Sequence, residues 1–574
     1  MSSEILGIDL GTTNTVAAVF REGEAVYISN ALGHKLTPSV VALDPEKKQL
    51  FVGRGAKEIL SMKPDNAAAA FKRDMGEDRS YKLGSRKLGP IELSAHILDS
   101  VREDAERELG VTIDRCVVTV PAYFGEAQRQ ATHKAATLAG MTVERILNEP
   151  TAAAIAYGLQ KRDEESQFLI FDLGGGTFDV CVMELFEGLL EVKGVAGESR
   201  LGGEDFTQAL VELGLRIAEI EVSTARTFAS DYAILSRRAE LLKRQLTSWK
   251  EGQLRVPAFG SDKREQTLTI ERAQADQAFA PLLDRMKQAC RVALRGAGVK
   301  IDSLDEIVLV GGASRMPCVR DFVQSYFGKP PMVELDPDLI VAKGAAIQAA
   351  LCKDQGGGDL DIVVTDIISH SLGLEASKEI AGRHVNGFFS PVIHRNTTVP
   401  VTRTSTFSTI ERNQTEMNLN VYEGEHRRVS ENHLVGALTV KGIPKGPAGQ
   451  NILVRFTFDL DGLLEVEATI AETGKTFATV LHRSGKSVDN KAVATFQKRL
   501  AKLKQDRAEE PRNKDLLFRA QALWSEVDEG ERSYLDECIE AFEIALAQGE
   551  SATITSRFEE LARLCESLDG GERW

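Results

Sequence analysis

The distribution of apolar and polar residues changes along the 574-residue chain, and the first change comes near residue 355. Before it, short apolar runs that suit buried strands alternate with segments that suit helices. Strands are predicted at Cys116–Val120 and Ile307–Val310, and helices at 125–139 and Pro317–Phe327. This alternation indicates an α/β architecture.

From about residue 367 to 485 helical signals disappear, and β-branched alternation between Gly, Asn and Pro turns replaces them. Strands are predicted at Val399–Phe407, Glu416–Tyr422, Ala437–Val440, Ile452–Phe458 and Leu463–Ile470. This segment is therefore expected to form a compact all-β domain.

From about residue 487 the apolar period becomes 3.6, which predicts a set of polar-faced helices. The apolar positions are Val493, Phe496, Leu500 and Leu503, and later Leu535, Cys538, Ile539, Phe542 and Leu546. Between the first two parts, Gln355 and the glycine run 356–358 lead into the apolar segment 362–364. Such a segment is typical of a linker that can dock on a neighbouring domain.

Composition narrows the functional classes. Hydrophobic content of 43% and charged content of 27% are typical of a soluble globular protein. A formal net charge of −15 argues against nonspecific binding to nucleic acid or to an acidic membrane. Seven scattered cysteines without a C-x-x-C pair indicate reduced thiols, and no export or anchoring segment is recognised. A cytoplasmic protein is expected.

Two glycine-threonine turns carry the candidate chemistry. The first reads Ile8-Asp9-Leu10-Gly11-Thr12-Thr13-Asn14, and the second reads Phe171-Asp172-Leu173-Gly174-Gly175-Gly176-Thr177-Phe178-Asp179. Each lies between two apolar runs, which predicts a strand, a tight turn and a strand. Glycine lets backbone N–H groups approach an anion, and the aspartate suits Mg²⁺ between phosphate oxygens. Either turn alone fits an ordinary hairpin, but their repetition predicts a nucleotide held between two related lobes.

A third glycine pair, in Val310-Gly311-Gly312-Ala313-Ser314-Arg315, lies between a predicted strand and a predicted helix. This turn can pack flat against a base or ribose, with Arg315 stacking on the ring.

These motifs, together with others, resemble those of DnaK-type chaperones of the seventy-kilodalton heat-shock family over nearly the whole chain. The others are Thr-Val-Pro121-Ala-Tyr-Phe, Asn148-Glu149-Pro150-Thr151, Leu-Gly202-Gly203-Glu204-Asp205-Phe and Gly344-Ala-Ala-Ile-Gln-Ala. Within the family the chain is most similar to the HscC-like branch. The resemblance implies a two-lobed actin/hexokinase-like ATPase domain (1–358), a linker (359–366), a β-sandwich peptide-binding domain (367–486) and a C-terminal helical lid (487–574).

The resemblance also implies an ATP-dependent chaperone that binds ATP or ADP with Mg²⁺ and K⁺. Asp9 and Asp172 would hold Mg²⁺ through its waters, and Thr177 and Asp179 would complete the γ-phosphate and potassium side. The phosphates would contact Gly11, Thr12, Thr13, Asn14, Gly174, Gly175 and Gly176. Lys72 would reach the γ-phosphate, and Glu149 would position the attacking water. From its residue type alone, Lys72 would be a solvated lysine, and Glu149 also suits a helix N-terminus.

The remaining nucleotide contacts implied by the resemblance lie on the base and ribose side. They are Gly202, Gly203, Glu240, Lys243, Arg244, Thr247, Gly311, Gly312, Ser314, Arg315 and Asp338. Residues 240, 243, 244 and 247 share one face of a helix, so a salt-bridged solvent face is the alternative interpretation.

In the β domain the resemblance implies an apolar pocket for an extended client segment, lined by Leu374, Phe407, Met417 and Leu419. Ser377 and Ile410 would form an arch over the peptide, although Phe407 and Leu419 also suit an ordinary core. A J-domain partner would act through Pro121, Arg129, Arg145, Asn148 and Asp366. Whether an exchange factor is used stays open, because the region between about 206 and 290 is shorter than the family's.

Two departures concern the client end: the linker reads Ile362-Val363-Val364-Thr365-Asp366 without the family's Thr-Pro, and the arch residues differ. Sugar kinases and actin-like filament proteins share the ATPase fold. They need neither a β domain nor a helical tail after residue 366, so the C-terminal third argues against both.

Overall fold

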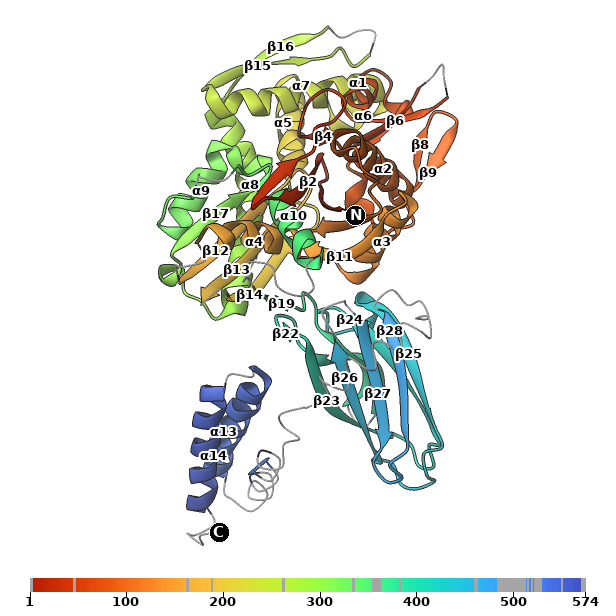
Figure 1. The fold of residues 1–574 in the computed structure, drawn as a ribbon, viewed down its shortest axis with the longest axis vertical. Helices are drawn as coiled ribbons and strands as arrows, with labels where there is room; N and C mark the ends of the chain where they lie inside the picture. Colours follow the sequence, from red (N-terminus) through yellow and green to blue (C-terminus); the bar gives the residue numbers. More distant parts are fainter. Residues whose placement is uncertain are drawn as a thin grey trace. The chain divides into compact units, whose positions relative to one another are not determined.

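The chain divides into two compact units, Met1–Ser369 and His370–Trp574, which are described separately (Figure 1). The computed structural model describes residues 4–44, 48–161, 165–186, 189–260, 264–332, 336–353, 363–380, 383–458 and 463–482. In the C-terminal part it describes residues 513, 516–517, 520, 529–548 and 551–568.

The first unit contains a mixed sheet built around the first glycine-threonine turn. The strand order is β11 (Thr142–Asn148), β10 (Arg115–Val120), β1 (Ile5–Leu10), β2 (Asn14–Arg21) and β3 (Glu24–Tyr27), and β4 (Thr37–Pro38) also pairs with β2. Strands β1 and β2 are antiparallel, with Asp9 opposite Val16, whereas β1 and β10 are parallel. Helices α2 (Pro90–Leu109) and α3 (Glu126–Leu138) contribute to the apolar core against this sheet.

The second sheet repeats this arrangement around the second turn. Its order is β17 (Glu306–Val310), β12 (Ser166–Leu173), β13 (Phe178–Phe186), β14 (Leu189–Glu198) and β18 (Val363–Val364). Strands β12 and β13 are antiparallel with Asp172 opposite Asp179, and β12 and β17 are parallel. Both predicted strand–turn–strand units are therefore confirmed.

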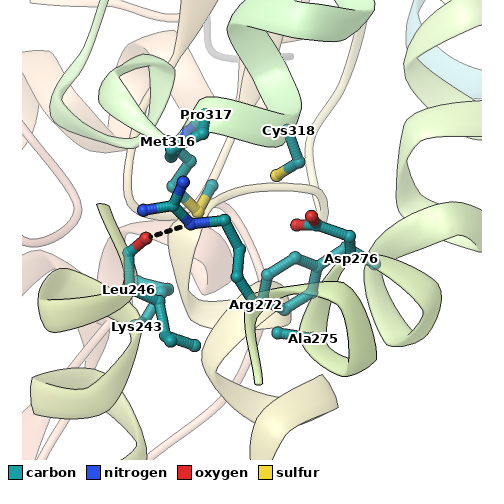
Figure 2. Close-up of a pocket in the computed structure, with 9 residues that line it drawn as sticks. Lys243, Leu246, Arg272, Ala275, Asp276, Met316, Pro317 and Cys318 are labelled. Atoms are coloured by element: carbon teal, nitrogen blue, oxygen red, sulfur yellow. Dashed lines mark hydrogen bonds between the residues drawn. The ribbon is translucent and has the colours of Figure 1, made fainter. Parts of the chain in front are cut away.

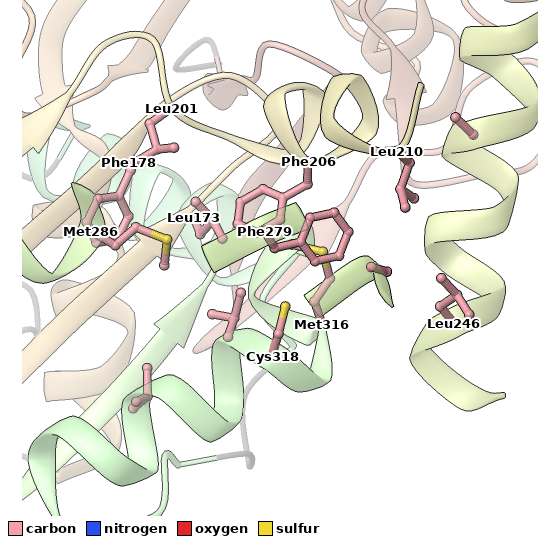
Figure 3. Close-up of a cluster of buried hydrophobic side chains, with 14 of the residues drawn as sticks. Leu173, Phe178, Leu201, Phe206, Leu210, Leu246, Phe279, Met286, Met316 and Cys318 are labelled. Carbon is pink, nitrogen blue, oxygen red and sulfur yellow. The ribbon is translucent and has the colours of Figure 1, made fainter. Parts of the chain in front are cut away.

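Helices cover the second sheet and place their apolar faces in one large core (Figure 3). They are α5 (Gly203–Ile217), α7 (Ala229–Ser248), α8 (Arg272–Ala297) and α9 (Pro317–Phe327). Phe206 of α5 contacts Phe279 of α8, with ring centroids 5.0 Å apart. Phe178, one residue after the second turn, belongs to the same core. The turn is consequently anchored by buried apolar side chains.

Helices α4 (Glu149–Lys161) and α10 (Ile340–Lys353) approach each other so closely that a side chain is excluded between them. A Cβ atom added to Gly344 would lie 1.7 Å from the carbonyl oxygen of Ala152. On β1, a Cβ added to Gly7 would lie 2.3 Å from the backbone nitrogen of Ala346. The two helices and the strand that leads into the first turn thus pack backbone against backbone.

The remaining elements of the first unit are short. They are β5 (Val40–Leu43), β6 (Leu50–Val52), α1 (Arg54–Met62), η1 (Pro64–Asn66), β7 (Ala67–Ala69), η2 (Phe71–Asp74), β8 (Tyr81–Leu83), β9 (Arg86–Leu88), α6 (Val222–Thr227), β15 (Glu251–Val256), β16 (Gln266–Glu271), η3 (Ile301–Ser303), η4 (Gly312–Arg315) and β19 (Asp366–Ile367).

Part of the predicted linker continues the second sheet. Val363 and Val364 pair in parallel with Leu189 and Leu190 of β14, and the Thr365 N–H donates to the Leu190 carbonyl over 3.0 Å. The glycine run and residues 359–362 lie outside the described residues. The apolar segment therefore adds a strand to the edge of this sheet through backbone hydrogen bonds.

The second unit contains two four-stranded antiparallel sheets. The first orders β21 (Arg383–Ile393), β20 (Leu372–Ile380), β24 (Glu416–Glu423) and β25 (His433–Lys441), and the second orders β23 (Val401–Ser408), β26 (Asn451–Phe458), β27 (Leu463–Ile470) and β28 (Thr476–His482). The other elements here are β22 (Thr398–Val399) and η5 (Val429–Glu431). The single strand predicted at Val399–Phe407 is wrong in one respect: Pro400 separates β22 from β23, because proline has no N–H for a ladder.

Two helices are described after the sheets, α13 (Glu529–Gln548) and α14 (Ser551–Leu568). Leu535, Cys538, Phe542 and Leu546 of α13 are buried in one cluster with residues of α14, as the 3.6 period predicted. The periodic positions 493–503 lie outside the described residues. Among the described helices, none combines the length and apolar character needed to cross a bilayer.

The close approach of α10 to α4 leads to a stability prediction. Gly344→Ala should lower the free energy of unfolding by about 3 kcal/mol, since the added methyl must displace the Ala152 backbone rather than a flexible side chain. Urea unfolding followed by circular dichroism would measure the change.

Gly158→Ala on α4 is the matched control. The nearest heavy atom to its new Cβ would be Cδ1 of Leu185 at 4.0 Å, so the methyl fits. This variant should be unchanged or more stable by about 0.5–1 kcal/mol, because alanine restricts the unfolded chain. Equal losses in both variants would contradict the packing argument.

Candidate functional site

The two glycine-threonine turns, whose aspartates Asp9 and Asp172 are 163 residues apart in the chain, meet in space. A Cβ added to Gly175 would lie 1.8 Å from Oγ1 of Thr13, and one added to Gly176 would lie 2.5 Å from Cγ2 of Thr12. Side chains at these two positions would collide with the first turn. Glycine is therefore needed here for the approach of the two turns as well as for turn geometry.

The N-terminus of α5 docks on the second turn. The N–H groups of Gly203 and Glu204 donate to the carbonyls of Gly174 and Gly175 over 2.9 and 2.8 Å. A Cβ added to Gly202 would lie 2.5 Å from the Gly176 nitrogen. Because a helix N-terminus carries a partial positive charge, this arrangement favours an anion at the turn.

Two buried donors at this junction have no hydrogen-bond acceptor within the described part of the structure. They are Oγ1 of Thr13 and Nε of Arg73. Both border the second turn, since a Cβ at Gly176 would lie 2.9 Å from the Arg73 Nε. Buried donors of this kind normally have a partner, and an oxyanion such as a phosphate supplies one. The residues present therefore fit a phosphate group.

Three aspartates border the turns, and each has a raised pKa; Asp172 and Asp179 are buried, and Asp9 is half-buried. Burial raises the pKa of Asp9 to about 7, with a further contribution from Glu149, whereas Lys72 and a 3.2 Å hydrogen bond from Thr119 oppose the shift. Burial and Glu149 likewise raise the pKa of Asp179 to about 7, although its carboxylate accepts the Tyr123 N–H. Burial, Glu149 and Asp179 raise the pKa of Asp172 well above its ordinary value.

Lys72 and Glu149 form a buried ion pair beside these aspartates. The Lys72 Nζ lies 2.5 Å from Oε1 of Glu149, and the two side chains are 4% and 9% exposed. The alternative of a solvated lysine is therefore wrong. Glu149 also begins α4, which confirms its position at a helix N-terminus, and its role in positioning the attacking water stays a prediction.

The carboxylates Asp9, Asp172, Asp179 and Glu149 outnumber the single lysine among them, and a divalent cation would balance the excess charge. Among the described residues, no group of three or more acidic, histidine or cysteine side chains is placed to ligate a metal directly. Coordination through water, as predicted from the sequence, does not require such a group. The charge of the site fits Mg²⁺ held in this way.

Four of the residues predicted for the base and ribose lie on α7, and this helix contacts α5. They are Glu240, Lys243, Arg244 and Thr247. Lys243 donates to the Gly203 carbonyl over 2.7 Å and to Thr207 Oγ1 over 2.9 Å. Glu240 pairs with Lys243 at 2.5 Å and with Arg244 at 2.8 Å, and Thr247 lies one turn further on. The helix face is salt-bridged, as the interpretation of a salt-bridged solvent face predicted. Lys243 is nevertheless buried, and its contacts join the face to the start of α5, which docks on the second turn.

The third glycine pair packs against the second turn. Gly311 has a φ of 78°, and a Cβ there would lie 2.3 Å from the Leu173 carbonyl oxygen. The Ser314 hydroxyl donates to the Gly311 carbonyl over 2.7 Å. Arg315 pairs with Asp336 at 2.6 Å and Asp338 at 2.9 Å while remaining partly exposed. The stacking of Arg315 on a base stays a prediction.

A small pocket lies behind this region, between α7, α8 and the start of α9 (Figure 2). Arg272 crosses it and donates from Nε to the Leu246 carbonyl over 2.8 Å. Of the predicted nucleotide contacts only Lys243 lines it. The pocket is therefore adjacent to the predicted site and does not coincide with it.

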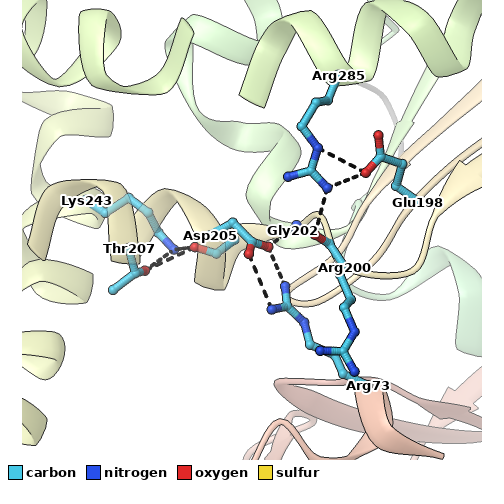
Figure 4. A network of polar contacts seen from close by, with 9 residues as sticks. Arg73, Glu198, Arg200, Gly202, Asp205, Thr207, Lys243 and Arg285 are labelled. Atoms are coloured by element: carbon cyan, nitrogen blue, oxygen red, sulfur yellow. Dashed lines mark hydrogen bonds and ion pairs between the residues drawn. The ribbon is translucent and has the colours of Figure 1, made fainter. Parts of the chain in front are cut away.

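A polar network that sequence reasoning missed joins the Lys72 segment to the start of α5 (Figure 4). Arg73 pairs with Asp205 at 2.5 Å, and the same carboxylate accepts the Gly202 N–H over 2.8 Å. The sequence offered one signal for this pair. Arg73 directly follows Lys72, and Asp205 belongs to the motif Leu-Gly202-Gly203-Glu204-Asp205-Phe, so both adjoin predicted site residues.

The second half of this network centres on Asp74, which is buried. Its carboxylate accepts hydrogen bonds from Arg79 over 2.8 Å, from the Tyr81 hydroxyl, and from Arg200 over 3.2 Å. Arg200 also reaches Glu77 over 3.0 Å. Nearby, Arg285 pairs with Glu198 and donates to the Arg200 carbonyl over 3.0 Å. No sequence signal marked Asp74.

Of the residues predicted for a J-domain partner, Pro121 and Asn148 lie at the ends of β10 and β11. Arg129 of α3 donates to the Phe124 carbonyl over 3.1 Å and to the Asn148 side chain. Pro121 is buried just after β10, and Arg145 is half-buried on β11. Asp366 lies on β19, where only the backbone is described.

In the second unit, the predicted peptide contacts divide by exposure. Leu374 on β20 and Leu419 on β24 are buried, as the core interpretation of Leu419 held. The other four residues are partly exposed: Ser377 on β20, Phe407 on β23, Met417 on β24, and Ile410, which follows β23. The half-buried residues retain apolar surface for a ligand.

The electrostatics of Glu240 lead to a pH prediction. Burial alone would raise its pKa, but Lys243 and hydrogen bonds from Lys243, Thr207 and Arg244 lower the pKa to about 2. The ionised carboxylate therefore stabilises the folded state above its ordinary pKa near 4.5, and this stabilisation disappears as the pH falls toward 2. Glu240→Gln should lower the free energy of unfolding by about 1–2 kcal/mol at pH 7, and by less at pH 3.5.

Urea titrations at the two pH values would measure the difference. Glu265→Gln is the control, because that exposed carboxylate is also paired with two arginines, Arg238 and Arg255. It should change stability less than Glu240→Gln at pH 7. A pH-independent loss in Glu240→Gln would contradict the charge argument.

The comparison with protein families places these features together. The family model described as Hsp70 protein matches residues 5–568, which include both turns, the aspartates, the Lys72–Glu149 pair and the β-rich second unit. Hsp70 proteins are ATP-dependent chaperones with ATPase activity that bind ATP or ADP with Mg²⁺, bind unfolded polypeptides and usually act with J-domain co-chaperones. Because the match covers nearly the whole sequence, the chain belongs to the Hsp70 family.

Proposed function

We propose that this Hsp70 protein couples ATP hydrolysis in the first unit to the affinity of the second unit for extended apolar peptide segments. The observation that carries the proposal is the buried Lys72–Glu149 pair, which lies among three aspartates of raised pKa next to two facing glycine-threonine turns. A charged pair in such a place suits phosphoryl transfer, which depends on positioning and charge stabilisation.

The roles proposed for the chain's residues follow from their contacts. The amides of Gly174–Gly176 and the hydroxyls of Thr12 and Thr13 hold the phosphates, with Gly11 and Asn14 shaping the first turn. Asp9 and Asp172 hold Mg²⁺ through water, and the bound ion supplies charge neutralisation at the phosphates. Lys72 contacts the γ-phosphate, Glu149 orients the attacking water, and Thr177 and Asp179 line the γ-phosphate and K⁺ side.

On the other side of the phosphates, we assign the base and ribose to α7, α5 and the third glycine pair. The contact residues are Gly202, Gly203, Glu240, Lys243, Arg244, Thr247, Gly311, Gly312, Ser314, Arg315 and Asp338. The junction of Lys243 with the Gly203 carbonyl supports this assignment, because it links the base side to the phosphate side.

For the second unit we propose a pocket formed by Leu374, Phe407, Met417 and Leu419, with Ser377 and Ile410 closing over the peptide. An extended ligand satisfies its backbone through strand-like hydrogen bonds while the pocket accepts an apolar side chain. The partial exposure of Phe407 and Met417 supports the assignment.

The domain limits that go with this proposal are 1–358, 359–366, 367–486 and 487–574, within the HscC-like branch and in the cytoplasm. A J-domain protein would act near Arg145, Asn148 and Asp366. The strand that Val363 and Val364 add to β14 supports a linker that communicates with the ATPase unit. Coupling of this kind is typically worth about 1–3 kcal/mol.

The proposal is tested by the release of a fluorescent peptide. ATP should accelerate peptide dissociation from the wild type, whereas Lys72→Ala should abolish most ATP turnover, because Lys72 provides the buried cation of the site. Lys82→Ala, which removes an exposed lysine of β8, is the control and should behave as wild type.

Two results would contradict the proposal in different ways. If ATP leaves the peptide off-rate of the wild type unchanged, the coupling is wrong. If Lys72→Ala hydrolyses ATP at the wild-type rate, the catalytic assignment is wrong.

The network around Asp74 makes a separate prediction about nucleotide release. Arg200→Ala removes an ion pair between the segment carrying Lys72 and the turn before α5, so it should speed ADP dissociation. Because Arg200 is 58% exposed, we expect only about a two- to fivefold effect.

Stopped-flow release of a fluorescent ADP analogue would measure the rate. Arg107→Ala is the control, since Arg107 pairs with Asp104 inside the single helix α2 and is similarly exposed. Equal rates for Arg200→Ala and Arg107→Ala would show that the network does not hold the nucleotide.

A further inference from the structure

Three positively charged side chains in the second unit gather around one aromatic ring. The charged groups of Lys378, Arg427 and Arg428 lie 5.5, 5.4 and 3.9 Å from the ring centroid of Phe388. Phe388 is only 2% exposed, whereas all three cationic residues are exposed. These three residues are called the cation cluster below. It presents concentrated positive charge to solvent from the β20–β21 hairpin and the loop after β24.

The cation cluster has no neutralising ion pair among the described side chains. Within the described part of the chain, none of its three members has a carboxylate at ion-pair distance. The acids that flank the two arginines in sequence have other partners: Glu425 accepts from Ser371 over 2.7 Å, and Glu431 lies 3.2 Å from His426.

Such a cluster carries a repulsive cost at low ionic strength, because all three cations lie around the same ring and the Debye length then exceeds their separation. A cation–π contact at an exposed site contributes only about 0.5–1 kcal/mol. The repulsion that remains would be relieved by an external anion. The cation cluster is therefore a local concentration of positive charge for which the described side chains supply no ion pair.

The cation cluster lies directly beside the residue proposed to arch over the peptide. Lys378 follows Ser377 in β20, and the Ser377 hydroxyl lies 2.5 Å from Oδ1 of Asn386. Arg428 donates to the carbonyl of the same Asn386 over 3.1 Å. Phe388 pairs with Ala376 across the hairpin. The arch residue and the cations are thus connected through one asparagine.

We propose that the cation cluster selects clients in which the apolar segment is flanked by acidic residues. This inference rests on the proposed function, because it places the peptide next to Ser377. A client carboxylate a few residues from the apolar side chain would reach Lys378 or Arg427, while Arg428 is held by Asn386.

The test uses the full-length protein with ADP and three labelled peptides that share one apolar centre. Their flanks are acidic, neutral or basic, and fluorescence anisotropy gives each Kd at low and at high salt. The acidic peptide should bind about five- to tenfold more tightly than the basic one at low salt, and the difference should shrink at high salt.

The double variant Lys378→Gln/Arg427→Gln should abolish this preference and leave the affinity for the neutral peptide unchanged. Lys475→Gln is the control, because Lys475 is an exposed lysine that also lies over an aromatic ring, 4.9 Å from Phe477. It should keep the wild-type preference. Both substituted residues of the double variant are exposed, and circular dichroism would verify the fold.

Three other results would overturn the inference. Equal binding of the acidic and basic peptides, or tighter binding of the basic one, would show that the cluster does not select flanks. Displacement of the neutral peptide by an oligonucleotide, which has charge without an apolar side chain, would indicate a general polyanion site. If no peptide binds whatever its flanks, the proposed peptide-binding function itself is wrong.

Discussion

The first unit is organised around carboxylates that have been removed from water with little opposite charge nearby. Burial raises the pKa of Asp9, Asp172 and Asp179, Glu149 adds to each shift, and Lys72 is the one lysine that the described residues place among them. Burial of this kind is unfavourable unless something binds there. The surrounding features all bring compensating positive charge to the same place: backbone amides at two turns, a helix N-terminus and buried donors without acceptors. A site of this composition is completed by a ligand that carries both phosphates and a cation.

Close backbone packing is what allows that concentration of charge. Gly175 and Gly176 let the second turn touch Thr12 and Thr13, and Gly344 lets α10 touch α4 at the opposite side of β1. Each turn therefore packs against the other turn, and the strands that carry it are anchored in an apolar core. Small movements between the two sheets would change the geometry of the site, because no flexible side chain lies between the turns to absorb them.

Local features of the fold were predictable from the sequence, and long-range ones were not. The paired hairpins follow from apolar runs interrupted by glycine and aspartate, and α13 follows from its period. The contact of Lys72 with Glu149 joins residues 77 positions apart, and only the family resemblance indicated it. Asp74 stands in a polar stretch that looks solvent-exposed; Arg79 and Tyr81 are local partners, but its third partner, Arg200, lies 126 residues later. No local pattern encodes a partner at that distance.

The way in which Val363 and Val364 join the second sheet has a consequence for how this part of the chain can evolve. Their attachment to Leu189 and Leu190 uses main-chain groups, which every residue except proline provides. Substitutions among β-branched residues would preserve such a fastening, whereas a proline here would remove a donor. Sequence drift in this segment can accordingly tune how firmly it is held without abolishing the mode of attachment. The two residues also pair with backbone groups of Leu189 and Leu190 that would otherwise form the edge of the sheet.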